Sequence, residues 1–455
     1  MTRDLTTGSP TKVILQFAIP VLFGLLLQQV YSLVDTAIVG HALGVMALGG
    51  VGSTGSLNFL VIGFCNGLCT GMAIPIAQAF GANNRKELRI LTGNCIWLCV
   101  LVSAALLLLT LPSCHWMLRV TGTPEEQFSY AYSYIFIIFA GIPTTLLYNM
   151  SACILRALGD SKTPVWFLAL ASAINIALDL LFVYPLQMGV AGAAVATVIS
   201  QAVSGLLCVL FMAKRFEILR MNADERRLRR PQAMRLLGMG LPVGLQFSIT
   251  AVGSVLLQSS VNSLGAIPVS GAATAGKLFQ LLACPYDTLA MAASNFAGQN
   301  LGAGKFDRIR RGVWTCMALG MIYCVAHILL VQFGCEYAVL LFMSREESGA
   351  VLPYTLQMCR IVSYFGPLLL GVNVFRLSIQ GMGFSRLALF AGILEMIARV
   401  IMAVWGVPAL GFTGACLAGP LAWVLADAFL VPACFACIRK REQQALDARK
   451  ELATE

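Results

Sequence analysis

Long apolar segments recur along nearly the whole chain, and they constrain the fold more than any other feature. Ala18–Val39, for example, contains a single charged residue, Asp35. Of the 455 residues, 58% are hydrophobic and only 11% are charged, whereas soluble globular proteins carry about 25% charged residues. The apolar runs are continuous rather than alternating, which excludes a β-barrel and indicates an all-α membrane protein.

The apolar segments are numerous enough for twelve transmembrane helices. Each is long enough to cross the hydrocarbon core, which requires about 20 residues. The expected cores are 13–38, 47–80, 91–112, 130–155, 164–185, 190–213, 236–262, 268–300, 312–333, 353–378, 387–408 and 412–438.

Basic residues mark one side of the membrane. The net charge is +10, and the Lys and Arg residues cluster in short loops after every second span, most densely in 214–235. The loops on the other side offer only Arg119 and Arg345. Cytoplasmic loops carry the excess of basic residues, so both termini are expected in the cytoplasm of a multi-pass protein, in a bacterial inner membrane. Basic residues confined to such loops also argue against nucleic-acid binding.

The second half of the chain repeats the first. Gln78, Gly81-Ala82 and Arg89 recur at one constant offset as Gln299, Gly302-Ala303 and Arg310. We therefore expect an N-terminal lobe (1–213), a cytoplasmic linker (214–235), a C-terminal lobe (236–438) and a cytoplasmic tail (439–455). Six spans per half give both lobes the same orientation, related by a pseudo-two-fold axis, with a substrate cavity expected between them.

Two acidic residues lie inside apolar segments of the first half, Asp35 and Asp179. An acid at the bilayer centre costs roughly 2.5–3.5 kcal/mol, so such residues mark a functional site by default. Asn175 precedes Asp179 by four residues and lies on the same helical face. Hard oxygen ligands of this kind suit a proton or a sodium ion.

Several motifs, taken in their order along the chain, resemble those of the multidrug and toxic compound extrusion (MATE) family. They include Ala18-Ile19-Pro20 with Val34-Asp35-Thr36, the segment from Gln78 to Asn83, its repeat from Gln299 to Gly304, and Asn175 to Ser200. The acids of the first lobe resemble the DinF-type branch, whereas Ser248-Ile249-Thr250 and Gly371-Val372-Asn373 lack the acids of the NorM-type branch.

The resemblance implies a function for particular residues. It implies a cation site, for a proton or Na⁺, built from Asp35, Asn175, Asp179 and Thr197. It also implies that the first span bends at Pro20 when the carboxylates are protonated. The alternatives are a static kink and a proline near the end of the span.

The second lobe contains its own charges within the expected spans. They are Lys277, Asp287, Arg360, Arg376, Glu395, Arg399 and Asp427. Glu395 and Arg399 are four residues apart and are expected to pair. Structural pairs are one interpretation of this charge network, and a role in substrate binding or coupling is the other.

The leading hypothesis is a secondary antiporter that exports amphipathic organic cations in exchange for protons or sodium. A flippase or exporter of lipid-linked or anionic amphipaths is the alternative, suggested by the basic residues of the second lobe. Neither an enzymatic cluster nor a nucleotide-binding motif is evident, so we expect no enzyme and no cofactor besides the coupling ion. The expected partners are small organic cations and membrane lipids, and the expected state is a monomer.

Overall fold

The structure is a computed structural model that describes residues 4–339 and 345–454. Contacts divide the chain into two compact units. The N-terminal unit contains Ile19–Ser248, and the C-terminal unit joins Leu5–Ala18 to the chain from Ile249 onward.

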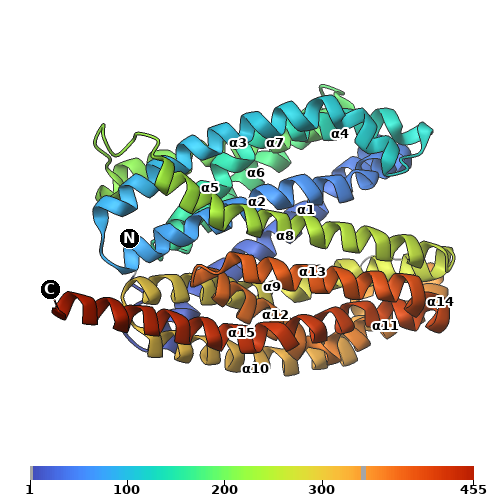
Figure 1. Cartoon of the computed structure of the whole chain (residues 1–455). Helices are drawn as coiled ribbons and strands as arrows, with labels where there is room; N and C mark the ends of the chain where they lie inside the picture. The colour runs from blue at the N-terminus through green and yellow to red at the C-terminus, as the bar shows by residue number, and fades with distance from the viewer. Residues whose placement is uncertain (1–3, 340–344, 455) are drawn as a thin grey trace. The chain divides into compact units, whose positions relative to one another are not determined.

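The N-terminal unit is a bundle of antiparallel helices (Figure 1). Its helices pack mainly as α6 on α7, α5 on α7 and α2 on α5. Their bounds are α1 (Pro10–Ser53), α2 (Gly55–Gly81), α3 (Arg85–Val120), α4 (Glu125–Ala140), α5 (Ile142–Ala157), α6 (Lys162–Val183) and α7 (Gly189–Arg215).

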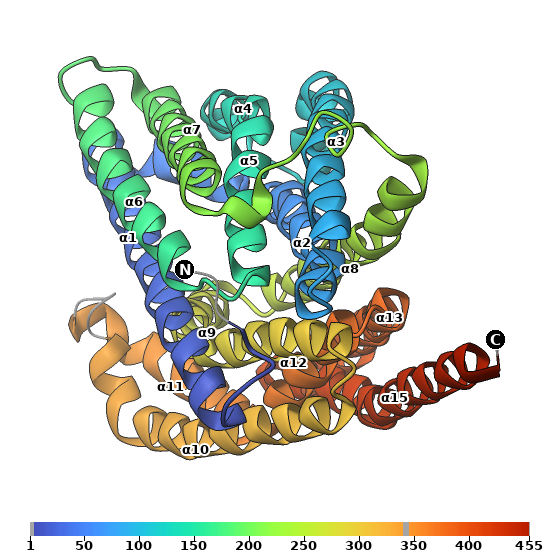
Figure 2. The same ribbon diagram turned by 90° about the vertical axis from the view of Figure 1, so that its left-hand side faces the viewer.

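The C-terminal unit repeats this packing. The corresponding pairs are α13 on α15, α12 on α15 and α9 on α12, and Figure 2 shows α9 beside α12. The bounds are α8 (Arg230–Asn262), α9 (Ala266–Gly302), α10 (Phe306–Val339), α11 (Arg345–Tyr364), α12 (Gly366–Gly381), α13 (Ser385–Ile401), α14 (Val407–Leu410) and α15 (Phe412–Thr454). The predicted internal duplication is therefore present in the packing of the helices.

The helices account for the twelve predicted spans. Within residues 4–339 and 345–454, nine helices are long and apolar enough to cross a membrane, and two bent pairs raise the number to eleven. The remaining predicted span is α9, which is 37 residues long but carries Lys277 and Asp287 in its sequence.

Breaks within the spans are the main local difference from the prediction. The expected fourth span is α4 and α5, bent by 51°, and the tenth is α11 and α12, bent by 54°. In each pair a glycine and a proline meet at the bend, Gly141 with Pro143 and Gly366 with Pro367. α1 kinks at Gly44, where a φ of 82° favours glycine, between the first and second expected spans. The second span itself is interrupted at Thr54, because α1 ends at Ser53 and α2 begins at Gly55.

The unit boundaries differ from those drawn from the apolar segments. The beginning of the first span, up to Ala18, clusters with the C-terminal unit, and α8 up to Ser248 clusters with the N-terminal unit. The segment 214–235 begins in the last residues of α7, contains a 3-10 helix at Glu217–Leu219 and enters α8 at Arg230. Within the expected tail, 439–455, α15 continues as one helix to Thr454 (Figure 1).

Candidate cation-coupling site

The four residues of the predicted cation site come from three helices of the N-terminal unit. Asp35 lies on α1, Asn175 and Asp179 lie one turn apart on α6, and Thr197 lies on α7. Asp179 is 0% exposed and Asn175 is 2% exposed, whereas Asp35 and Thr197 are half-buried. The structure therefore brings these residues into one place, as the prediction requires.

The side chains form a continuous chain of polar contacts. The carboxyl groups of Asp35 and Asp179 are hydrogen-bonded to each other. The amide orientation of Asn175 that satisfies its neighbours donates to Asp179 Oδ2 at 3.3 Å and accepts from the Thr197 backbone N–H at 3.2 Å. Because a hydrogen bond between two carboxyl groups requires a proton on one of them, this arrangement suits a site that holds a shared proton.

One oxygen of each carboxyl group lacks a conventional donor. Oδ1 of Asp35 and Oδ1 of Asp179 are buried and accept no hydrogen bond from an N–H or O–H group of the described residues. A buried oxygen without a donor is costly, and a second proton on the pair would satisfy part of this deficit. The site can therefore exist with different numbers of protons, which is what ion coupling requires.

Two tyrosines beside the carboxyl groups were missed at the level of sequence. Tyr31 and Tyr134 lie close enough to interact electrostatically with both Asp35 and Asp179. Tyr31 is four residues before Asp35, so helical spacing could have identified it. Tyr134 comes from α4, and no local pattern connects it with the acids.

A small polar cavity adjoins the acids. Its volume is about 90 Å³, which is room for about six water molecules at roughly 15 Å³ each but well below the size of common drug pockets. It is lined by Gln28, Tyr31, Ile62, Asn66, Thr145, Tyr148, Asn149, Leu168, Ala171, Ser172, Asn175, Ser200 and Gln201. Tyr31 and Asn175 belong to both the cavity and the surroundings of the acids, so water in the cavity has access to the site.

Pro20 lies inside α1, which stays helical through this position. The chain passes from the C-terminal unit to the N-terminal unit between Ala18 and Ile19, directly before Pro20. A proline inside a helix removes a backbone hydrogen bond. Bending of α1 at Pro20 stays a prediction. The position of Pro20 directly after the boundary between the two units is compatible with a hinge there.

The buried charges of the C-terminal unit centre on Glu395. Its carboxylate contacts Arg376 and lies 3.3 Å from Arg399 Nη2, so the pairing predicted from spacing is present. Arg376 also interacts electrostatically with Asp427 and Asp287. Asp287 Oδ1 accepts a hydrogen bond from Asn373 Nδ2 at 3.0 Å.

Lys277 and Arg360 are not part of this cluster. Both side chains are exposed, and neither has an ion-pair partner within the described part of the chain. The seven predicted charges are therefore a cluster of five, Asp287, Arg376, Glu395, Arg399 and Asp427, and two separate exposed cations.

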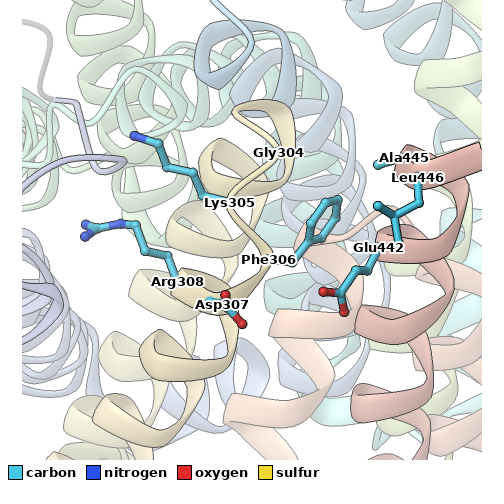
Figure 3. A pocket seen from close by; sticks show the side chains of 8 residues that line it. All are labelled: Gly304, Lys305, Phe306, Asp307, Arg308, Glu442, Ala445 and Leu446. Carbon is cyan, nitrogen blue, oxygen red and sulfur yellow. The ribbon is translucent and has the colours of Figure 1, made fainter. Parts of the chain in front are cut away.

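The turn between α9 and α10 adjoins a pocket of about 400 Å³. Figure 3 shows Lys305 and Arg308 pointing away from Asp307 and Glu442. Lys305 Nζ donates to the Thr6 carbonyl oxygen at 2.9 Å, and Arg308 Nη2 donates to that of Leu5 at 3.1 Å. These basic groups therefore hold the chain before α1 and are engaged by its carbonyl groups.

No metal centre is evident in the described residues. They contain no group of three or more His, Cys, Asp or Glu residues that could hold a metal ion.

Comparison with known proteins gives consistent matches. A sequence model of the MatE family matches residues 20–181 and 242–405, once in each half. Probable multidrug resistance protein YoeA of Bacillus subtilis is 32% identical over 346 residues, which are 72% of this chain and 74% of the relative.

Two further matches concern the branch and the fold. DNA damage-inducible protein F of Escherichia coli is 28% identical over 355 residues, 74% of each chain, which fits the expected branch. A solved structure described as the outward-facing conformation of a multidrug resistance MATE family transporter has a TM-score of 0.90 at 22% identity, covering 96% of this chain and 98% of that chain.

Proposed function

This chain belongs to the MatE family, and we propose that it is a secondary antiporter that exports amphipathic organic cations in exchange for protons. The relatives named above include a probable multidrug resistance protein, which supports efflux of small molecules. We further propose that it works as a monomer in the bacterial inner membrane, in contact with lipids and with both termini in the cytoplasm.

The contact between Asp35 and Asp179 is the observation that favours coupling to protons over coupling to sodium ions. Two carboxyl groups in direct hydrogen-bond contact share a proton, whereas a sodium ion would have to separate their oxygens. In the proposed cycle, protons from the outside neutralise the pair, and loss of a proton to the cytoplasm restores its charge. The membrane potential contributes roughly 2.3 kcal/mol per charge per 100 mV to this step.

Pro20 is the proposed hinge of the cycle. Neutralising the acids removes charge from the centre of α1, and the missing backbone hydrogen bond at Pro20 lowers the cost of bending there. The position of Pro20 directly after the crossing between units would transmit a bend of α1 to both units.

Transport in proteoliposomes under separately imposed gradients tests the proposal. Purified protein should move ethidium when a pH gradient alone is imposed, and a sodium gradient alone should have no effect. Transport that follows sodium and ignores pH would contradict proton coupling. Failure to move any cation, together with movement of a lipid-linked or anionic amphipath, would favour the flippase interpretation instead.

A further inference from the structure

The chain segment directly before α1 is bound by polar side chains of the C-terminal unit. The Leu5 backbone N–H donates to Gln299 Oε1 at 2.9 Å, and Asn300 Nδ2 donates to the Leu5 carbonyl oxygen at 3.2 Å. Both amide side chains are 0% exposed, and Leu5 itself is 1% exposed. Because a buried amide that loses its partner is costly, these contacts fix the position of Leu5 against α9.

Two basic side chains from the turn after α9 bind the next residues of this segment. Lys305 Nζ donates to the Thr6 carbonyl oxygen at 2.9 Å, and Arg308 Nη1 donates to that of Gly8 at 2.7 Å. Figure 3 shows both basic side chains on the same side of the turn. Hydrogen bonds from charged donors are roughly twice as strong as neutral ones. The segment 5–8, which we call the anchor segment, is therefore held through its backbone.

The N-terminal unit binds the beginning of α8 at the same two positions of the internal repeat. Gln78 and Glu87 are the counterparts of Gln299 and Arg308, at the constant offset of the repeat. Arg235, near the start of α8, donates to Gln78 Oε1 at 3.2 Å and lies 3.4 Å from Glu87 Oε1. The second position changes the sign of its charge between the halves but keeps its contact. This recurrence indicates that the repeated motif serves to hold the segment that begins a long helix.

α1 and α8 are helices along which the chain passes from one unit to the other. The start of α1 up to Ala18 belongs to the C-terminal unit, and α8 up to Ser248 belongs to the N-terminal unit. Each of these helices is therefore held at its beginning by the unit that the rest of the helix leaves. A helix can transmit a displacement between two bodies only when both bodies hold it.

Apolar packing also holds the start of α1, but it does not fix the position of the helix along its axis. Ile14 and Phe17 are each 1% exposed and lie on one helical face. Hydrophobic contact is non-directional, whereas hydrogen bonds require particular distances and angles. The polar contacts of the anchor segment are therefore the feature that resists sliding of α1 along the C-terminal unit.

We propose that four side chains form a clamp that keeps the anchor segment on the C-terminal unit throughout the transport cycle. These positioning residues are Gln299, Asn300, Lys305 and Arg308. The inference rests on the proposed function, and it assigns the fixed end of the bending helix. With that end held, a bend of α1 at Pro20 moves the units. Without the clamp, the acids still exchange protons, but the bend is lost as movement of the free end of α1.

Transport and binding measurements with the double variant K305Q/R308Q separate these steps. In proteoliposomes under a pH gradient, its kcat for ethidium should fall roughly tenfold, the effect of losing hydrogen bonds from charged donors. Its KM should change by less than about twofold, because the clamp lies outside the acid pair and the cavity beside it. For the same reason, ethidium binding in detergent should keep the pH dependence of the wild type.

Two control variants separate the clamp from a general effect of charge. Lys305→Arg keeps a charged donor at this position and should transport at close to the wild-type rate. K214Q/R439Q removes one exposed lysine and one exposed arginine elsewhere and should also transport normally. An unchanged kcat in K305Q/R308Q, or an equal loss in K214Q/R439Q, would overturn the inference.

A distance measurement in the wild-type background tests the anchor without depending on the folding of a clamp variant. Spin labels are placed at two exposed positions, Lys12 on α1 and Arg311 on α10. They are attached through unnatural amino acids, because the chain contains 15 cysteines. The distance distribution should be narrow and the same at acidic and at alkaline pH. A distribution that shifts with pH would contradict the proposal, because the start of α1 would then move on its own unit.

Failure of the proposed function has a different signature. If Asp35→Asn leaves ethidium transport under a pH gradient intact, coupling through the acids fails, whereas the distance between Lys12 and Arg311 still reports on the anchor. If the anchor alone fails, that distance changes with pH and Asp35→Asn still stops transport.

Discussion

The carboxyl group of Asp35 on α1 is hydrogen-bonded to the carboxyl group of Asp179 on α6. The first belongs to a half-buried side chain and the second to a side chain with 0% exposure. Loss of the shared proton leaves two negative charges in contact, which repel each other. We therefore expect the packing of α1 against α6 at this point to depend on the protonation of this pair.

Asp35→Asn and Asp179→Asn should each abolish efflux driven by a pH gradient. An amide keeps the shape and the hydrogen bonding of the neutral acid but does not release a proton. Ethidium movement in everted vesicles measures the effect, with protein quantity checked by immunoblot. We expect less than roughly one hundredth of the wild-type rate, the range typical for loss of an essential acid–base group.

Asp447→Asn is a suitable control, because Asp447 is an exposed acid near the C-terminal end of α15. It should transport normally. Wild-type rates in both Asp35→Asn and Asp179→Asn would remove these residues from the mechanism.

Pro20→Ala should slow transport without weakening substrate binding. Alanine restores the backbone hydrogen bond that proline lacks, worth about 1 kcal/mol, and so makes the straight form of α1 harder to bend. A change of this size corresponds to a roughly fivefold lower kcat. Rates and KM in proteoliposomes measure the effect. Pro112→Ala, inside α3, is the matched control, and equal effects in the two variants would argue against a hinge at Pro20.

The overall architecture was predictable because hydrophobic length alone identifies spanning helices. The pairing of Asn175 with Asp179, and that of Glu395 with Arg399, followed from four-residue spacing within one helix. The bends were not predicted, although Gly141 with Pro143 offered a local signal.

Contacts between distant segments could not be read from local spacing. Asp35 and Tyr134 meet only because α1 and α4 fold into one unit, and Arg376 was not connected with Glu395 for the same reason. Exposure could not be predicted either, since the exposed Arg360 and the buried Arg376 lie in the same expected span. Helical periodicity places a residue on one face of a helix but does not say which face is exposed in the folded protein.

Glu225 should stabilise the linker 214–235 above acidic pH. The Asn222 backbone N–H and the Arg89 guanidinium beside it lower the pKa of its carboxyl group, at distances of 2.9 Å and 3.0 Å. Because the pKa is lower in the folded state, the stabilisation is complete above the unfolded pKa of about 4.3. It is lost as the pH falls through the folded pKa.

Thermal unfolding of Glu225→Gln in detergent tests whether the stabilisation by Glu225 is lost at low pH. The variant should have a lower Tm than the wild type at pH 7, and the difference should shrink below roughly pH 4. Glu217→Gln is the control, because Glu217 is an exposed acid of the same segment. A difference that grows on acidification would contradict the assignment.

The arrangement around Glu395 predicts an unequal effect of removing its partners. Arg399→Met leaves Glu395 paired with Arg376 and should be mild. Glu395→Gln leaves two buried arginines without their shared carboxylate, and breaking a buried pair in this way costs roughly 3–5 kcal/mol. Adding Arg399→Met to Glu395→Gln removes one of these uncompensated charges, so the double variant should be more stable than Glu395→Gln alone and less stable than Arg399→Met. Unfolding in detergent measures the three stabilities, and a double variant less stable than both single variants would show that Glu395 and Arg399 do not act as a pair.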